Sequence, residues 1–235
     1  MKLIRSMRNR ESISYILTYL VLFWSALGVG LQIIRSAYDI NPLESILVTQ
    51  FYFTTQSNII IFLVSLTQIL KPTKGKIFKL FAFIGLVNIS LTGIIFHILL
   101  TPFMSHVSFL NHVLHTINPL LYILFYFICI HDYVPIKRFY YSLLYPLFYM
   151  VFVYTIVSPI FGDMLERVVT TFESARYVYP FLDPRTYNSG VSGLLLFNLG
   201  LLAPLIAIFA FLLAYLKVIF EQKFHTKEKE ETQVV

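Results

Sequence analysis

The segment SFLNHVLHTINPLLYILFYFICI, residues 108–130, joins a polar beginning to a long apolar stretch. A helix needs roughly 20 apolar residues to cross the hydrocarbon core of a bilayer, and this segment is long enough. Its first half nevertheless carries Asn111, His112, His115 and Asn118. Because ionisable groups inside a membrane span are costly and commonly functional, these residues are the first candidates for a site.

The composition of the whole chain indicates a membrane protein. Of its 235 residues, 57% are hydrophobic and 13% are charged, and the mean hydropathy is +0.74. Soluble domains average about 25% charged residues, so we expect much of this surface to face membrane lipids. The single cysteine, Cys129, excludes an intrachain disulfide and a cluster of thiolate metal ligands.

Six stretches are long and apolar enough to span a bilayer. They are residues 13–35, 44–70, 77–100, 108–131, 140–160 and 193–220. The first is too long for the core of a signal peptide, so we expect it to be retained. The sequence therefore predicts an all-α polytopic membrane protein, with one six-span domain over residues 1–224. The tail, 225–235, is polar and is expected to be disordered.

The basic residues are unevenly divided between the two sides of the predicted spans. Fourteen of the 18 Lys and Arg residues lie in the N-terminus, the second loop, the fourth loop and the C-terminal tail. The positive-inside rule then places both termini in the cytoplasm. Since these residues determine topology, we do not expect a nucleic-acid partner. The outward loop 161–192 is unusually long, which favours a lid or a binding loop.

Polar residues of three spans lie at overlapping depth in this orientation. They are Gln50, Thr54, Ser57 and Asn58 on span two, His97 on span three, and His112 and His115 on span four. The span-two residues follow i, i+4, i+7, i+8 spacing and so share one helical face. Such groups should face the bundle interior. We therefore expect an outward-facing cavity among spans two, three and four.

Two interpretations of these residues stay open. The simplest role for Gln50, Ser57 and Asn58, taken singly, is to form hydrogen bonds between helices. For His112 and His115, a structural role and a catalytic role have equal support from the spacing alone. A threonine hydroxyl becomes a nucleophile when a base such as neutral histidine lies beside it.

A zinc site is the weaker chemical alternative. Three histidines could hold zinc with an open position for water, as a lipid amidase would need. The chain has no HExxH or cysteine motif, however, and the i, i+3 spacing of His112 and His115 is poor for ligands. We therefore expect neither a metal nor another cofactor.

Four short motifs resemble a known family. LNHVLHT (110–116) resembles the Asn-His-x-x-His-Thr segment of the androgen-induced-type membrane hydrolases. YVYPFLD (177–183) is similar to their Val-Tyr-Pro-Phe-Leu-acidic stretch, and FYFTTQSN (51–58) to their aromatic-x-Thr segment. Together with YPLFY (145–149), the last motif is closest to the bacterial six-span relatives of that family.

The resemblance implies a threonine hydrolase that acts on a lipid ester within a bacterial plasma membrane. Animal members cleave fatty-acid esters of hydroxy fatty acids with a threonine nucleophile and a histidine. Carried over, the nucleophile falls on Thr54 and the histidine on His115. Thr55 is the alternative, because aligning a Thr-x-x-amide pattern to Asn58 shifts the register by one. The animal pattern has an acid where this chain has Ser57 or Asn58, which leaves the lipid substrate open.

Supporting roles follow for several further residues. We expect Asn111 and His112 to orient the site, and Pro119 to loosen the helix at the carbonyl of His115. In the long loop, Tyr179, Phe181 and Asp183 are expected to pack over the mouth of the cavity. The alternative function is a non-enzymatic transporter or lipid-binding protein that uses the same cavity.

Overall fold

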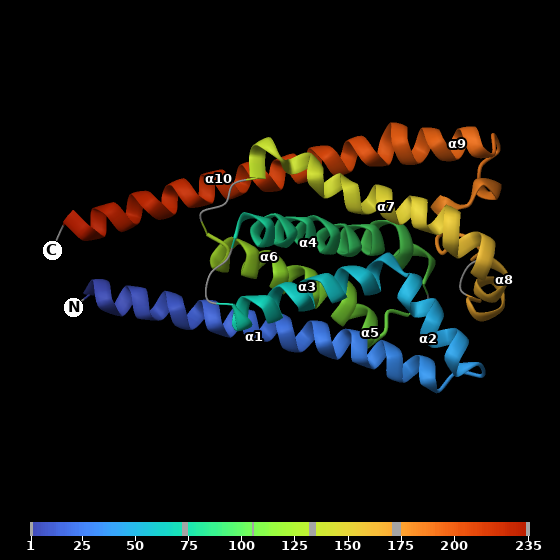
Figure 1. The fold of residues 1–235 in the computed structure, drawn as a ribbon, viewed down its shortest axis with the longest axis horizontal. Helices are drawn as coiled ribbons and strands as arrows, with labels where there is room; N and C mark the ends of the chain where they lie inside the picture. Colours follow the sequence, from blue (N-terminus) through green and yellow to red (C-terminus); the bar gives the residue numbers. More distant parts are fainter. Residues whose placement is uncertain (1, 72–74, 105, 132–134, 171–174, 234–235) are drawn as a thin grey trace.

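The chain folds into an elongated bundle of helices (Figure 1). The computed structural model describes residues 2–71, 75–104, 106–131, 135–170 and 175–233, and side chains are described for all of these except 2–10, 103, 135 and 224–233. The described residues contain no strand. Six helical spans are long and apolar enough to cross a membrane, so the predicted all-α, six-span class is confirmed.

The bounds of four spans agree closely with the prediction. They are Glu11–Ala37 within α1 (Lys2–Ala37), Lys76–Leu100, Phe109–Cys129 and Val191–Lys223. The third span joins α4 (Lys76–Ile95) to η1 (Phe96–Leu100), and a 3-10 turn, η2 (Thr101–Phe103), follows. The fourth joins α5 (Phe109–His112), η3 (Val113–Ile117) and α6 (Asn118–Cys129). The sixth joins α9 (Val191–Leu195), η9 (Leu196–Leu202) and α10 (Ala203–Gln233), which includes most of the polar tail.

The second span differs from its predicted form. Instead of one helix over 44–70, the structure has α2 (Pro42–Phe51) and α3 (Phe53–Leu70), separated by an extended Tyr52 with φ −67° and ψ 131°. The expected polar face from Gln50 to Asn58 is therefore wrong at its first member. Gln50 lies on α2, where its side-chain amide donates to the Ile46 carbonyl.

The break at Tyr52 is stabilised by side chains from elsewhere in the bundle. A broken helix frees backbone groups that need partners, above all in a membrane. The Tyr149 hydroxyl donates to the carbonyl of Phe51 at 2.8 Å, and the Gln56 amide donates to that of Gln50 at 3.0 Å. Both acceptors belong to the last turn of α2, so the break has two of its freed carbonyls paired.

Four spans contain a π-helical turn, and a proline follows each turn at the second residue. The turns are η1, η3, η6 (Val153–Val157) and η9, and the prolines are Pro102, Pro119, Pro159 and Pro204. Proline has no N–H and its ring clashes with the carbonyl four residues earlier. A wider turn moves that carbonyl aside, as where the Asn118 N–H donates to the carbonyl of Val113. The loosening expected at Pro119 takes this form.

The fifth span is longer than the sequence predicts. It runs over Phe139–Val168, through η5 (Phe139–Leu143), α7 (Leu144–Phe152), η6 and α8 (Ser158–Val168). The predicted end at residue 160 is wrong because α8 is amphipathic. Leu165 is buried, with Phe161, Met164 and Val168 packed around it, while Asp163 is exposed.

Two hydrophobic cores hold the bundle together. The larger is formed by α1, α3, α4, α6 and α10, and Figure 1 shows α4 and α6 in the interior of the bundle. The smaller joins α2 and the fifth span to the loop that follows α8. This loop contains the turns η7 (Pro180–Leu182) and η8 (Pro184–Thr186), so it is packed against the spans.

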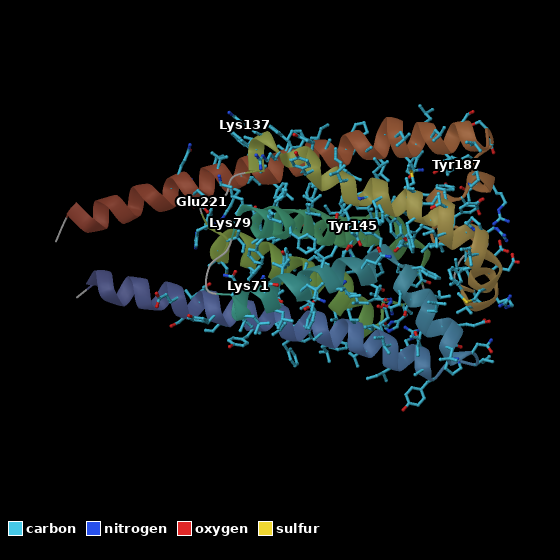
Figure 2. All side chains as sticks on the ribbon, viewed as in Figure 1. Lys71, Lys79, Lys137, Tyr145, Tyr187 and Glu221 are labelled. Atoms are coloured by element: carbon cyan, nitrogen blue, oxygen red, sulfur yellow. The ribbon has the colours of Figure 1, made fainter. Side chains whose placement is uncertain are left out.

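The charged residues are concentrated at the two ends of the bundle. Both chain ends lie at one end in Figure 1. Figure 2 shows Lys71, Lys79 and Lys137 toward that same end and Tyr187 at the opposite one. One cation is buried there: Lys217 is fully inaccessible and pairs with Glu221 at 2.7 Å. Its ammonium also donates to the Phe127 carbonyl at 3.0 Å, which ties α10 to the end of α6.

Candidate functional site

A cavity of about 310 Å³ lies between spans two to six, beneath the loop after α8. Its lining is mostly apolar, with polar groups at six positions. These are Thr54, Thr92, His115, Tyr149, Tyr179 and Asn198. The expected cavity among spans two, three and four is therefore present, but spans five and six supply much of its wall.

Thr54 enters the cavity from the first turn of α3, directly after the break at Tyr52. Thr55 points elsewhere: it is buried, and its hydroxyl donates to the side-chain oxygen of Gln32 on α1 at 2.9 Å. Thr55 does not line the cavity. Of the two threonines that the sequence leaves open, the geometry favours Thr54 as the one a ligand can reach.

His115 enters the same cavity from the π-helical turn η3. Its ring stacks on Phe96, with centroids 3.9 Å apart and planes 8° from parallel. Its Nδ1 lies 3.4 Å from the carbonyl oxygen of Thr92. A carbonyl only accepts, so this bond requires the proton on Nδ1 and leaves Nε2 as the basic nitrogen.

The close approach of η3 to α4 requires a glycine. A Cβ built on Gly93 would lie 2.9 Å from the His115 carbonyl oxygen and 3.3 Å from the Pro119 ring. Gly93 therefore lets the backbone of His115 rest against α4. In an α-helix the His115 carbonyl would accept from residue 119, but Pro119 has no N–H to donate.

Asn58 connects the helix of Thr54 to the helix of His115. Its side-chain amide donates to the Thr54 carbonyl at 2.9 Å and lies 3.4 Å from the carbonyl of Leu114, the neighbour of His115. Asn118 in turn donates to the Asn58 side-chain oxygen at 2.6 Å. Both asparagines are buried. They fix the relative position of the two helices beside the site, as hydrogen-bonding residues between spans do.

The Thr54 hydroxyl and the His115 ring do not hydrogen-bond to each other. Across the described residues, the imidazole is bonded to Thr92, whereas the Thr54 hydroxyl interacts with the phenol of Tyr179. Catalytic hydrogen bonds are often long in ligand-free structures and shorten when a substrate binds. The structure brings the two residues to one cavity without joining them.

Tyr179 lies inside the cavity. Its burial raises the pKa of the phenol, hydrogen-bonding interactions with the hydroxyl and backbone of Thr54 and the backbone of Phe53 lower it, and the net value is about 12. The ring stacks on Phe181, which also lines the cavity, with centroids 5.2 Å apart.

Asp183, by contrast, does not reach the cavity. It is fully buried, and its carboxylate accepts from the Arg185 backbone N–H at 2.8 Å and pairs with the Arg185 guanidinium at 3.0 Å. The same guanidinium pairs with Glu166 on α8 at 2.9 Å. Asp183 thus holds the loop against the fifth span, and the expectation that it covers the cavity mouth is wrong.

The remaining predicted residues also lie outside the cavity lining. His97 and Thr116 are bonded through Nε2 and the hydroxyl at 2.9 Å, and the His112 side chain is exposed. The N–H of Asn111 is capped by the Ser108 hydroxyl at 3.2 Å. The orienting roles expected for Asn111 and His112 thus have no contact to the site. Within the described part of the chain, no three His, Cys, Asp or Glu side chains gather as metal ligands would.

Sequence reasoning missed three polar residues that face the cavity. Thr92, Tyr149 and Asn198 each stand within an apolar span. Thr92 and Asn198 carry the same signal that singled out Thr54 and His115, a polar group inside hydrocarbon. Tyr149 gives less of a signal because aromatic residues are abundant throughout this chain.

Comparison of the chain with protein-family models, with curated proteins and with solved structures finds no match.

Proposed function

We propose that this protein is an intramembrane hydrolase of a lipid ester, with Thr54 as nucleophile and His115 as general base. One observation carries the proposal. Thr54 and His115 line the same largely apolar cavity, and the Asn58 amide lies within hydrogen-bonding distance of carbonyls on both of their helices. The resemblance of the motifs around both residues to the androgen-induced-type hydrolases selects the same pair.

The chemistry is acyl transfer in two steps. An ester bound in the cavity draws the Thr54 hydroxyl toward His115, whose Nε2 takes its proton. The threonine oxygen bonds to the acyl carbon, and the C–O bond to the leaving alcohol breaks as His115 returns the proton to that oxygen. Water, deprotonated by His115, then attacks the acyl-threonine, and the acid leaves as Thr54 regains a proton.

The cavity also fits the class of substrate. Its walls are mostly Leu, Ile, Phe and Met side chains, which suits an acyl chain. The polar groups on the α3 and η3 side of the cavity suit a single ester. We further propose that the protein lies in a bacterial plasma membrane with both termini cytoplasmic, supported by the basic residues at the end of the bundle where the termini lie.

Hydrolysis of nitrophenyl octanoate by the protein in lipid nanodiscs tests the proposal. We expect turnover by the wild type and none by Thr54→Ala or His115→Ala, with each variant folded as judged by size-exclusion chromatography. Because a cooperating pair acts as a unit, the double variant should lose no more activity than either single one. Turnover by Thr54→Ala at the wild-type rate would contradict the proposal.

A lipid-binding protein without catalytic activity is the second candidate, and one observation favours it. Thr54 and His115 each have another partner in this structure, as they would if they served only to close the cavity. This function predicts lipid that copurifies with the protein in fixed proportion and is never cleaved.

A further inference from the structure

Tyr179 is directed into the cavity by an unusual backbone turn. The preceding residue, Val178, has φ 71°, and the N–H of Tyr179 donates to the carbonyl of Tyr177 at 2.8 Å. Together these make a γ-turn of the rare form with positive φ, which is strained. Positive φ is especially unfavourable for a β-branched residue, and such strain is concentrated at functional sites. Since Val178 is itself buried in the smaller core, packing holds the turn in place.

The Tyr179 ring lies next to the beginning of α3, because its centroid is 6.0 Å from that of Tyr52, the residue that precedes the helix. The first amides of a helix have no partner within it, and interactions with the backbone of Phe53 and Thr54 and with the Thr54 side chain lower the pKa of the phenol. Amides that donate to a phenolic oxygen polarise its O–H and strengthen it as a donor. The free amides at the beginning of α3 thus strengthen the Tyr179 hydroxyl as a hydrogen-bond donor.

The other polar groups around the cavity have their hydrogens engaged. The Tyr149 hydroxyl donates to the Phe51 carbonyl at 2.8 Å, and that of Thr92 donates to the Asn88 carbonyl at 3.0 Å. Both hydrogens of the Asn198 amide are used, at 2.9 Å to the Phe181 carbonyl and 3.0 Å to the Leu194 carbonyl. Tyr179 lines the same cavity, and its phenol interacts with the side chain of Thr54, so we take it as the donor available to a substrate there.

Resting on the proposed function, we propose that the phenolic hydroxyl of Tyr179 is the oxyanion donor for acyl transfer at Thr54. As the threonine oxygen bonds to the acyl carbon, the carbonyl electron pair moves to the carbonyl oxygen. The Tyr179 O–H donates a hydrogen bond to that oxygen and keeps its proton throughout. When the tetrahedral intermediate collapses, the electron pair returns, the bond to the leaving alcohol breaks, and the phenol is unchanged.

Tyr179 acts as a donor and does not act as a base. Its pKa of about 12 keeps the phenol protonated throughout the neutral range. A general base must carry a free lone pair before it takes a proton, as the Nε2 of a neutral imidazole does. Tyr179 and His115 therefore divide the chemistry, one holding a proton and the other moving it.

Tyr179→Phe tests the proposal, with Tyr177→Phe as the matched control from the same loop. Tyr177 packs on Tyr154 and does not line the cavity. With nitrophenyl octanoate in nanodiscs, loss of one oxyanion donor should lower kcat about 100- to 1,000-fold and leave KM within about threefold. Tyr177→Phe should retain wild-type kcat.

The outcomes separate this inference from the proposed function. If Thr54→Ala is inactive and Tyr179→Phe keeps wild-type kcat, the oxyanion role is wrong while the nucleophile stands. If Thr54→Ala is as active as the wild type, the proposed function itself fails.

A fluorinated tyrosine at position 179 provides a second experiment, which remains informative if the Tyr179→Phe variant does not fold. Fluorine lowers the pKa of the phenol while the ring and its hydroxyl remain. We expect activity to fall as pH rises through the ionisation of the analogue, because a phenolate cannot donate. The wild type should show no such alkaline limb. Equal pH profiles for the two proteins would overturn the proposal, since a purely structural tyrosine has no need of its proton.

Discussion

Thr54 and Thr55 are adjacent in sequence, but they contact different parts of the bundle. Thr54 lines the cavity between spans two to six, whereas the hydroxyl of Thr55 donates to Gln32 on the first span at 2.9 Å. Successive residues on a helix point about 100° apart, which allows two neighbours to face different sides of α3. This divergence gives the two threonines separate roles.

The two threonines should therefore respond differently to substitution. Thr54→Ala is expected to abolish ester hydrolysis with little loss of thermal stability, because Thr54 lines a cavity and is only partly buried. Thr55→Ala should keep hydrolysis within about threefold and lose about 0.5–1 kcal/mol of stability, typical of one hydrogen bond between spans. Turnover assays and melting temperatures in nanodiscs check both expectations. Loss of activity in Thr55→Ala but not in Thr54→Ala would identify Thr55 as the nucleophile.

Asn58→Leu should impair both stability and catalysis. The substitution removes the donor to the Thr54 carbonyl and leaves the Asn118 amide without its partner at 2.6 Å. The Asn118 amide keeps its bond to the Trp24 carbonyl at 3.3 Å, but a buried N–H that loses its partner costs about 1–3 kcal/mol. We expect kcat to fall more than KM rises, because the hydrogen bonds of Asn58 between the two helices are lost. Ser65→Ala is the matched control, since the hydroxyl of this buried serine bonds only within α3. Equal kcat for the two variants would count against a positioning role for Asn58.

Pro119→Ala should change the site, and Pro159→Ala should not. Alanine restores the N–H that Pro119 lacks, so the π-helical turn that carries His115 can close to an α-helix. His115 would then rotate away from the cavity and hydrolysis would fall at least tenfold, with helix content by circular dichroism retained. The equivalent turn before Pro159 carries no residue that lines the cavity. Full activity in Pro119→Ala would show that hydrolysis does not require the π-helical turn.

The orientation in the membrane can be checked by cysteine accessibility. In a Cys129→Ser background, Lys137→Cys and Asn188→Cys place single exposed thiols at the two ends of the bundle. We expect an impermeant maleimide added to intact cells to label position 188 only, because the basic residues place position 137 in the cytoplasm. Labelling of position 137 alone would reverse the orientation.

The sequence was sufficient to predict six spans and the burial of Ser57, Asn58 and His115. His97 and His112, which were expected to face the bundle interior as well, are exposed. Hydropathy and length decide the spans, since a bilayer tolerates few alternatives to a helix. The sequence also indicates the π-helical turns, because a proline follows each of them at the second residue. Loosening of the helix was expected only at Pro119, although a proline stands at the corresponding place in three other spans.

Other features depend on contacts between distant segments and could not be predicted from local pattern. The break at Tyr52 depends on the Tyr149 hydroxyl, which pairs the freed Phe51 carbonyl. The meeting of Tyr179 with Thr54 depends on the strained turn at Val178 and on the core that surrounds it. Periodicity within one helix carries no information about such partners.

Mapping of a covalent adduct shows directly whether Thr54 is the nucleophile. The wild-type protein in nanodiscs is treated with a long-chain fluorophosphonate, digested, and its peptides are sequenced by mass spectrometry. We expect one phosphonylated residue, Thr54, and no adduct in His115→Ala, because the hydroxyl needs its base. An adduct on any other residue, or an unmodified Thr54 in protein that hydrolyses nitrophenyl octanoate, would contradict it.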